Sequence, residues 1–179
     1  MDKGLIQLYY GNGKGKTTAG VGSCVRAAGH GLKVLVYQFL KTPANTGEVS
    51  MLKSIPGIEY VDNTVHSPFL FNLTPEQQEY FAELYDNEFE AVLSKIYSGE
   101  YDLVFLDELI DAWNLNLIPR DKVLKLMETK PAGTELIISG HIYEESIDEL
   151  IARSDYVTEF KKVKHPFDNG ECARIGIEE

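Results

Sequence analysis

The sequence predicts an α/β fold of the P-loop NTPase (RecA-like) class, in which helices cover both faces of a mostly parallel sheet. Short apolar segments alternate with helical segments along the chain, a pattern typical of right-handed βαβ units. A glycine-rich segment at residues 11–15 lies between the first predicted strand and the first predicted helix. A later predicted strand ends in the carboxylates of Asp107 and Glu108. We expect the end of the chain to add one antiparallel hairpin.

The bulk composition is close to that of an average globular protein. A chain of 179 residues has the size of one domain, so we expect a single nucleotide-binding domain over residues 1–179. The net charge of -11 repels phosphate backbones and argues against a nucleic-acid partner. No apolar segment approaches the length of a membrane span, and no signal-peptide pattern is present. We therefore expect a cytoplasmic protein with no membrane partner.

The first part of the chain alternates predicted strands with one predicted helix. Three apolar segments are expected to form strands: residues 5–10, 33–39 and 58–61. A helix is expected over residues 15–28, where Gly20 and Gly22 would let it pack closely on the sheet.

The second part continues this alternation. Thr74-Pro75-Glu76-Gln77 is a capping box with proline at the first helical position, and it begins a helix that Gly99 ends. Two further helices are expected over residues 119–127 and 144–152, and strands over residues 103–106, 135–139 and 156–163. Asp168-Asn169-Gly170 predicts a hairpin turn before a last strand at residues 173–177.

The glycine-rich segment predicts a phosphate-binding loop. Backbone N–H groups of such a turn bind anions, and the helix N-terminus that follows adds partial positive charge. We expect ATP to bind to eight consecutive residues: Gly11, Asn12, Gly13, Lys14, Gly15, Lys16, Thr17 and Thr18. Lys16 would reach the terminal phosphates, and the hydroxyl of Thr17 would bind Mg²⁺.

The loop is one residue shorter than the usual phosphate loop. The usual spacing places four residues between the first glycine and Gly15, but Tyr10 stands where that glycine would be. Counted from Gly11, only three residues intervene. The phosphates must therefore lie in a different pose, which argues against ordinary phosphoryl transfer.

The acidic strand end predicts a metal site beside this loop. The carboxyl edge of a parallel sheet is its ligand-binding edge, so Asp107 and Glu108 are candidates to complete the coordination of Mg²⁺ with Thr17. The alternative is that these two acids only cap the next helix or are simply surface charges.

The motifs together resemble the bacterial ATP:corrinoid adenosyltransferases. The resemblance spans nearly the whole chain and rests on residues 11–19, 36–41, 106–108, 154–159, 163–170 and 175–178. Its most specific parts are the shortened loop and the segment Lys164-His165-Pro166-Phe167-Asp168.

The resemblance implies that cobalt(I) of a corrinoid, cob(I)yrinic acid a,c-diamide or cob(I)alamin, attacks the 5′ carbon of ATP and releases triphosphate. It implies catalytic roles for Lys16, Thr17 and Glu108, with Mg²⁺ or Mn²⁺ as the metal. It also implies an apolar wall against the corrin, for which Phe69 and Phe71 are the candidates. An electron donor such as a reduced flavoprotein and a homodimer are further expectations from the family.

The chain departs from the family pattern at two places that bear on function. Ser139-Gly140-His141 stands where relatives carry a Thr-Gly-Arg-like turn, so an arginine contact is lost or replaced. Residues 66–71 match poorly and contain no tryptophan. These departures leave room for a non-catalytic ATP- or corrinoid-binding carrier or regulator. A second alternative is a small-molecule kinase or ATPase on the same fold, against which the shortened loop weighs.

Overall fold

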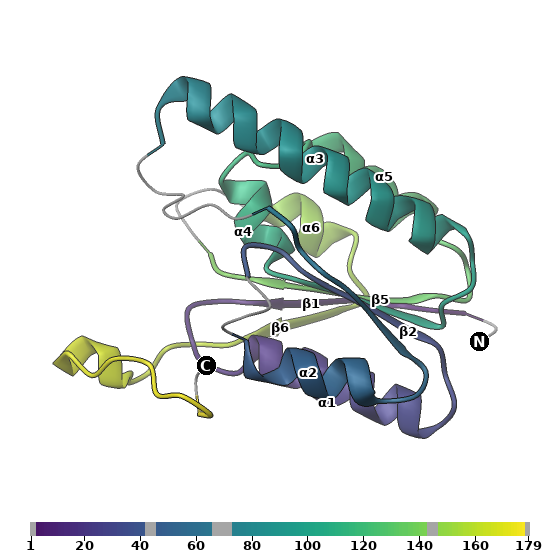
Figure 1. The fold of residues 1–179 in the computed structure, drawn as a ribbon, viewed down its shortest axis with the longest axis horizontal. Coiled ribbons are helices and arrows are strands. Elements are labelled where there is room, and N and C mark those ends of the chain that lie inside the picture. The colour runs from purple at the N-terminus through teal and green to yellow at the C-terminus, as the bar shows by residue number, and fades with distance from the viewer. Residues whose placement is uncertain (1–2, 42–45, 66–72, 143–146, 178–179) are drawn as a thin grey trace.

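A computed structural model describes residues 3–41, 46–65, 73–142 and 147–177. Its centre is a six-stranded sheet with the strand order β3-β2-β4-β5-β1-β6, shown in Figure 1. The strands are β1 (Ile6–Tyr10), β2 (Val34–Gln38), β3 (Ile58–Val61), β4 (Leu103–Asp107), β5 (Glu135–Gly140) and β6 (Tyr156–Glu159). All neighbouring strands pair in parallel, which confirms the predicted class of sheet.

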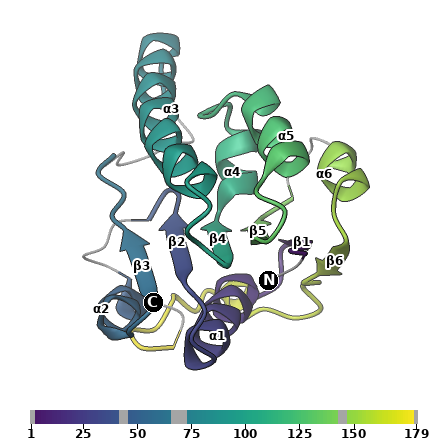
Figure 2. The same cartoon turned by 90° about the vertical axis from the view of Figure 1, so that its right-hand side faces the viewer.

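Helices cover both faces of this sheet. They are α1 (Lys16–Gly29), α2 (Gly47–Ser54), α3 (Pro75–Tyr97), α4 (Leu109–Asn114), α5 (Arg120–Thr129) and α6 (Asp148–Ala152). Figure 2 shows α1 and α2 below the sheet and the other four helices above it. The three-layer α/β architecture agrees with the prediction.

The central strand β2 explains why the sheet is sandwiched in this way. All its residues are buried, and successive side chains point to opposite faces. Val34 and Val36 belong to the apolar cluster with Cys24 of α1. Leu35 and Tyr37 belong to the larger cluster on the other face, with the helices from α3 onward.

Helix α1 packs closely on β4 because one of its residues has no side chain. A Cβ atom at Gly20 would lie 2.2 Å from the ring of Phe105, so only glycine fits there. The same expectation for Gly22 is wrong, since this residue is exposed and a Cβ atom there would meet nothing within 4 Å.

The predicted capping box begins α3. The Thr74 hydroxyl accepts a hydrogen bond from the Gln77 amide at 3.3 Å, and the Gln77 side chain accepts one from the Thr74 amide at 3.0 Å. The apolar stripe that follows is core, with Tyr85 and Phe89 almost fully buried.

The predicted C-terminal antiparallel hairpin is wrong. Strand β6 pairs in parallel with β1, and residues 173–177 form no strand. The Asp168-Asn169-Gly170 signal instead ends a short 3-10 helix (Pro166–Asn169), where Gly170 adopts φ 82° as the C-cap. Its left-handed glycine therefore turns the chain out of a helix and not between two strands.

Two helices were not predicted, α2 and α4. Helix α2 begins with a glycine, a poor helix former, and the side chain of its N-cap residue Thr46 makes no capping hydrogen bond. Helix α4 has six residues and follows Glu108, which adopts a left-handed conformation with φ 57°. For the predicted helix over residues 144–152, the structure shows Asp148–Ala152, and residues 143–146 lie outside the described residues.

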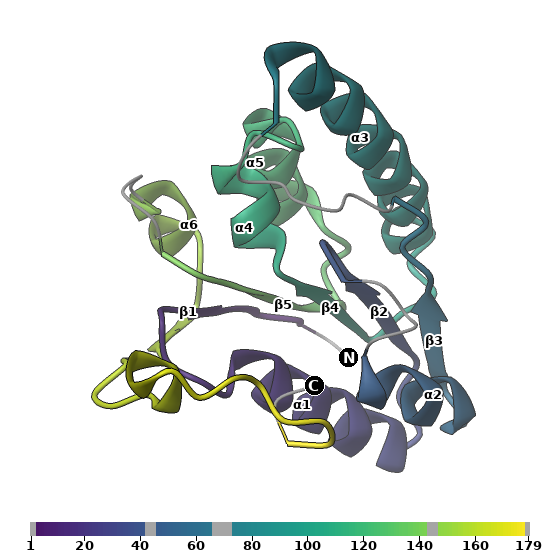
Figure 3. The ribbon, with the colours of Figure 1, turned by 60° about the vertical axis from the view of Figure 1, so that its left-hand side comes forward.

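The topology brings the predicted site residues to one edge of the sheet. Strand β5 lies between β1, which leads into the glycine loop, and β4, which ends at Asp107. The C-terminal segment after β6 passes the start of α1, as the yellow trace in Figure 3 shows. The carboxyl ends of these strands thus face a segment from the far end of the chain.

Candidate active site

The glycine loop connects β1 to α1 in the manner of a phosphate-binding loop. Gly11 and Gly15 have left-handed backbones, with φ 115° and 116°. The first helical hydrogen bond runs from the Ala19 amide to the Gly15 carbonyl, so the amides before residue 19 have no partner within the helix. These amides and the helix dipole make the start of α1 suited to an anion.

Phe160, which directly follows β6, contacts the glycine loop. The Gly13 amide donates a hydrogen bond of 2.6 Å to the Phe160 carbonyl. A Cβ atom at either Gly11 or Gly13 would lie 2.6 Å from this same oxygen. The contact that requires glycine at both positions is therefore with Phe160.

Lys16 is buried at the loop. Its ammonium donates hydrogen bonds to the carbonyls of Gly11, at 2.7 Å, and Gly13, at 3.1 Å. Burial lowers the pKa of Lys16, although the carboxylates of Asp111, Glu108 and Asp107 oppose this shift. A bound phosphate would replace the two carbonyls as the partner of the ammonium.

Asp107 is fully buried and takes hydrogen bonds on both carboxylate oxygens. Oδ1 accepts from the hydroxyls of Thr17, at 3.1 Å, and Ser139. Oδ2 accepts from the Gln38 amide at 2.9 Å and from the Lys41 ammonium at 2.6 Å. Four side chains from different elements therefore fix the orientation of this carboxylate.

Glu108 lies next to this network and is partly open to the cavity. Its backbone amide donates to the Ser139 hydroxyl at 3.1 Å, which ties the end of β4 to β5. Burial raises the pKa of Glu108 to about 7, against the lowering effect of Lys41. A cation bound at Glu108 would favour the ionised carboxylate.

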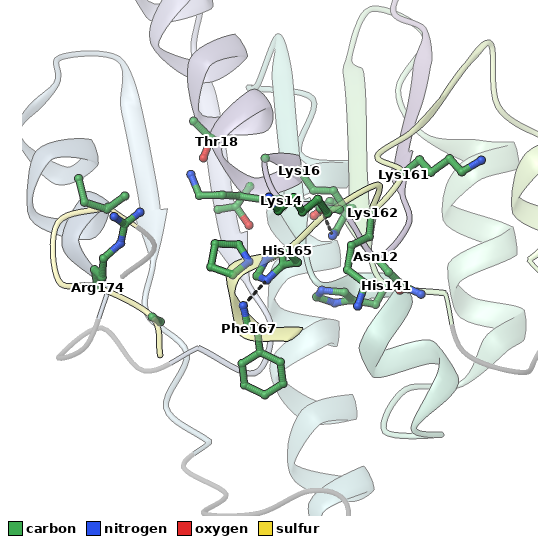
Figure 4. A pocket seen from close by; sticks show the side chains of 18 of the residues that line it. Asn12, Lys14, Lys16, Thr18, His141, Lys161, Lys162, His165, Phe167 and Arg174 are labelled. Atoms are coloured by element: carbon green, nitrogen blue, oxygen red, sulfur yellow. Dashed lines mark hydrogen bonds between the residues drawn. The ribbon is translucent and has the colours of Figure 1, made fainter. Parts of the chain in front are cut away.

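A cavity of about 980 Å³ opens over the loop. This volume is at the upper end of the range of about 300–1,000 Å³ for small-molecule sites. Basic side chains dominate the charged residues of its wall: Lys14, Lys16, Lys41, Lys161, Lys162, Lys164 and Arg174. The cavity is thus rich in cations although the chain as a whole carries a net charge of -11. Figure 4 labels Lys14, Lys16 and Lys162 among the residues that line it.

His141 follows the last residue of β5 directly. Its backbone amide and its Nδ1 atom each lie 3.0 Å from the buried carboxylate of Asp111. His141 is also in the cavity wall. Because Asp111 contacts Nδ1, a ligand in the cavity would meet the other ring nitrogen, Nε2.

The structure brings together most of the predicted site residues. Asn12 to Thr18, Asp107 and Glu108 all line the cavity, while Gly11 lies just behind it. Phe69 and Phe71 lie outside the described residues. The prediction missed Gln38, Lys41 and Ser139 as partners of Asp107.

The signals for these three missed residues were visible in the sequence. Gln38 is the last residue of a buried strand and Lys41 follows that strand, while Ser139 lies next to the end of another, so all three lie where ligand-edge residues are expected. Their contact with Asp107 depends on the order of the strands, which the sequence pattern does not give.

The fold and the site together are consistent with a P-loop NTPase-type protein. The family model ATP:corrinoid adenosyltransferase BtuR/CobO/CobP matches residues 2–178 of the chain. The chain therefore belongs to this family.

Curated relatives match over almost the whole chain. A corrinoid adenosyltransferase of Escherichia coli (strain K12) is 33% identical over 177 residues, covering 99% of this chain and 86% of the relative. A corrinoid adenosyltransferase of Pseudomonas aeruginosa is 32% identical, covering 99% and 84%. The corrinoid adenosyltransferase CobA of Salmonella typhimurium is 32% identical, covering 99% and 86%.

None of the helices in the described part of the chain is long and apolar enough to cross a membrane.

Proposed function

We propose that this protein transfers the 5′-deoxyadenosyl group of ATP to the cobalt(I) of a corrinoid and releases triphosphate. The observation that carries the proposal is the cation-rich cavity over a shortened phosphate loop, in a chain of this family. The leaving group of the reaction bears all three phosphates, and the cations of this cavity suit it.

The loop and its lysines would hold the triphosphate. The amides at the start of α1, together with Lys14 and Lys16, would bind the phosphate oxygens and stabilise the charge that develops on the leaving group. Because the corrinoid supplies the nucleophile, the protein's task is to orient the ribose carbon and not to deprotonate an attacking group.

The residues present suit a magnesium or manganese ion. Thr17 and the carboxylates of Asp107 and Glu108 supply oxygen ligands, which these ions prefer. Within the described residues, no group of three or more His, Cys, Asp or Glu side chains could hold a metal ion. Phosphate oxygens and water would therefore complete the coordination, and the metal would neutralise charge on the leaving triphosphate.

Several features of this function rest on the family resemblance alone. We propose either cob(I)yrinic acid a,c-diamide or cob(I)alamin as the corrinoid, and a reduced flavoprotein as the electron donor. Phe69 and Phe71 remain the candidates for the apolar wall beside the corrin. A homodimer in the cytoplasm is the expected state of the protein.

Product analysis tests the reaction. ATP, Mg²⁺ and chemically reduced cobalamin are incubated with the protein, and the optical change on Co–C bond formation is followed while inorganic products are separated. The proposal expects one triphosphate for each adenosylated corrinoid. Stoichiometric ADP would identify a kinase or ATPase instead, and corrinoid binding without adenosyl product would identify a carrier or regulator.

A further inference from the structure

Lys41 lies at the centre of the proposed metal site. It follows β2 at the carboxyl edge of the sheet, and its ammonium is 2.6 Å from Asp107 Oδ2 and 3.0 Å from the Thr17 hydroxyl. Its distance to Glu108 Oε1 is 3.6 Å. The ammonium therefore contacts the same three side chains that are proposed above to hold the metal.

The buried carboxylate explains why a cation is needed at this point. Asp107 has no exposure to solvent, and an ionised carboxylate in such a place is stable only when it is paired. Lys41 thus provides the positive charge that pairs with the buried carboxylate of Asp107 in the nucleotide-free protein.

We propose that Lys41 is a tethered cation that holds the metal site closed until ATP brings the metal in. The inference rests on the proposed function, since it takes Thr17, Asp107 and Glu108 as the metal ligands. An ammonium and a divalent ion cannot share these ligands, because two cations at such a short separation repel strongly. Entry of the metal therefore requires Lys41 to leave.

The triphosphate provides the place to which Lys41 moves. Its side chain is 20% exposed and already lines the cavity together with Lys16. A lysine has a flexible stem and a charge that binds phosphate from many directions. The metal and the displaced ammonium then both neutralise phosphate charge. Metal binding and nucleotide binding are consequently coupled through one side chain.

A purely structural ion pair would behave differently. If Lys41 only stabilised the fold, its removal would lower stability and leave the protein's affinity for free metal unchanged. If it competes with the metal, its removal should open the site to free metal. The affinity for metal without nucleotide separates these two roles.

The experiment measures Mn²⁺ binding to the nucleotide-free protein by electron paramagnetic resonance, in which bound Mn²⁺ loses the signal of the free ion. Wild type, Lys41→Met and Lys122→Met are compared. Lys122 is a matched control, because it also bridges two carboxylates, Asp86 at 2.7 Å and Glu90, but far from the cavity. We expect Lys41→Met to bind Mn²⁺ about tenfold more tightly than wild type, since an ion pair of this kind contributes about one factor of ten.

A second readout uses stability. Mg²⁺ without nucleotide should raise the Tm of Lys41→Met more than that of wild type or Lys122→Met, because binding to the folded state alone stabilises it. If Lys41→Met does not fold, Lys41→Gln keeps a neutral donor for Asp107 and is measured in the same way.

The outcomes separate this inference from the proposed function. Equal affinity for free Mn²⁺ in wild type and both Lys41 variants would overturn the inference. If these proteins still bind Mn·ATP, measured by water proton relaxation, the proposed metal site itself would stand. If no protein binds Mn·ATP, the metal site itself is wrong and the inference falls with it. Tighter Mn²⁺ binding in the Lys41 variants alone supports both.

Discussion

Glu108→Gln should make the protein more stable at alkaline pH. Burial raises the pKa of Glu108 from 4.5 to about 7, so the fold disfavours the ionised carboxylate. The unfolded chain ionises this group near pH 4.5, whereas the folded chain resists ionisation up to about pH 7. The resulting loss of stability is absent below the lower value, grows across this window and is complete above it.

The size of the effect follows from the pKa difference. The shift from 4.5 to about 7 corresponds to about 3 kcal/mol if each unit is worth about 1.36 kcal/mol. The Glu108 side chain is 23% exposed, and water screens part of this penalty. We therefore expect Glu108→Gln to gain about 1–2 kcal/mol in the free energy of unfolding at pH 8, and less at pH 5.

Urea unfolding at the two pH values provides the measurement. Glu100→Gln serves as the control, because Glu100 is exposed and lies far from the cavity. The same Glu108→Gln protein should lose adenosylation, since a proposed metal ligand has been removed. A variant that is no more stable than wild type at pH 8 would show that the buried carboxylate carries no such penalty, and the reasoning would fail.

Three further predictions concern the loop, α1 and the end of β5. Lys16→Ala should lower ATP-dependent turnover by about 100-fold or more while the far-ultraviolet circular dichroism stays unchanged, because the ammonium is proposed to bind the leaving group; full activity would refute this phosphate site. Gly22→Ala should raise the free energy of unfolding by about 0.5–1 kcal/mol, whereas Gly20→Ala should lower it, because only Gly22 faces open space. His141→Ala should weaken triphosphate binding measured by calorimetry and His141→Arg should retain it; equal affinities would exclude His141 as a phosphate contact.

The parts of the site that could be predicted from the sequence are those encoded locally. The phosphate loop needs glycines, a lysine and a threonine at fixed spacing between a strand and a helix, and all of these are neighbours in the chain. Asp107 and Glu108 were predicted because a continuous apolar strand ends there. In each case the chemistry depends on residues that are adjacent in sequence.

The parts that were missed depend on the order of the strands. Lys41 and Ser139 reach Asp107 only because β2 and β5 both flank β4, and no local pattern reports that order. The hairpin expected at residues 168–177 was wrong because its local signal fits two different structures. A glycine with positive φ serves a helix end as well as a strand turn, and only the surrounding packing decides between them.

The contact between Phe160 and the loop shows how a phosphate loop that is one residue short can still bind a triphosphate. The Gly13 amide already donates to the Phe160 carbonyl, so this amide is not free to bind a phosphate. The remaining donors are the amides nearer to α1, and Lys161 and Lys162 follow Phe160 directly into the cavity wall. The segment after β6 thus takes one donor from the loop and adds two cations. A triphosphate bound here would therefore depend on residues from both ends of the chain. Shortening the loop alone would not bring in the residues that follow β6.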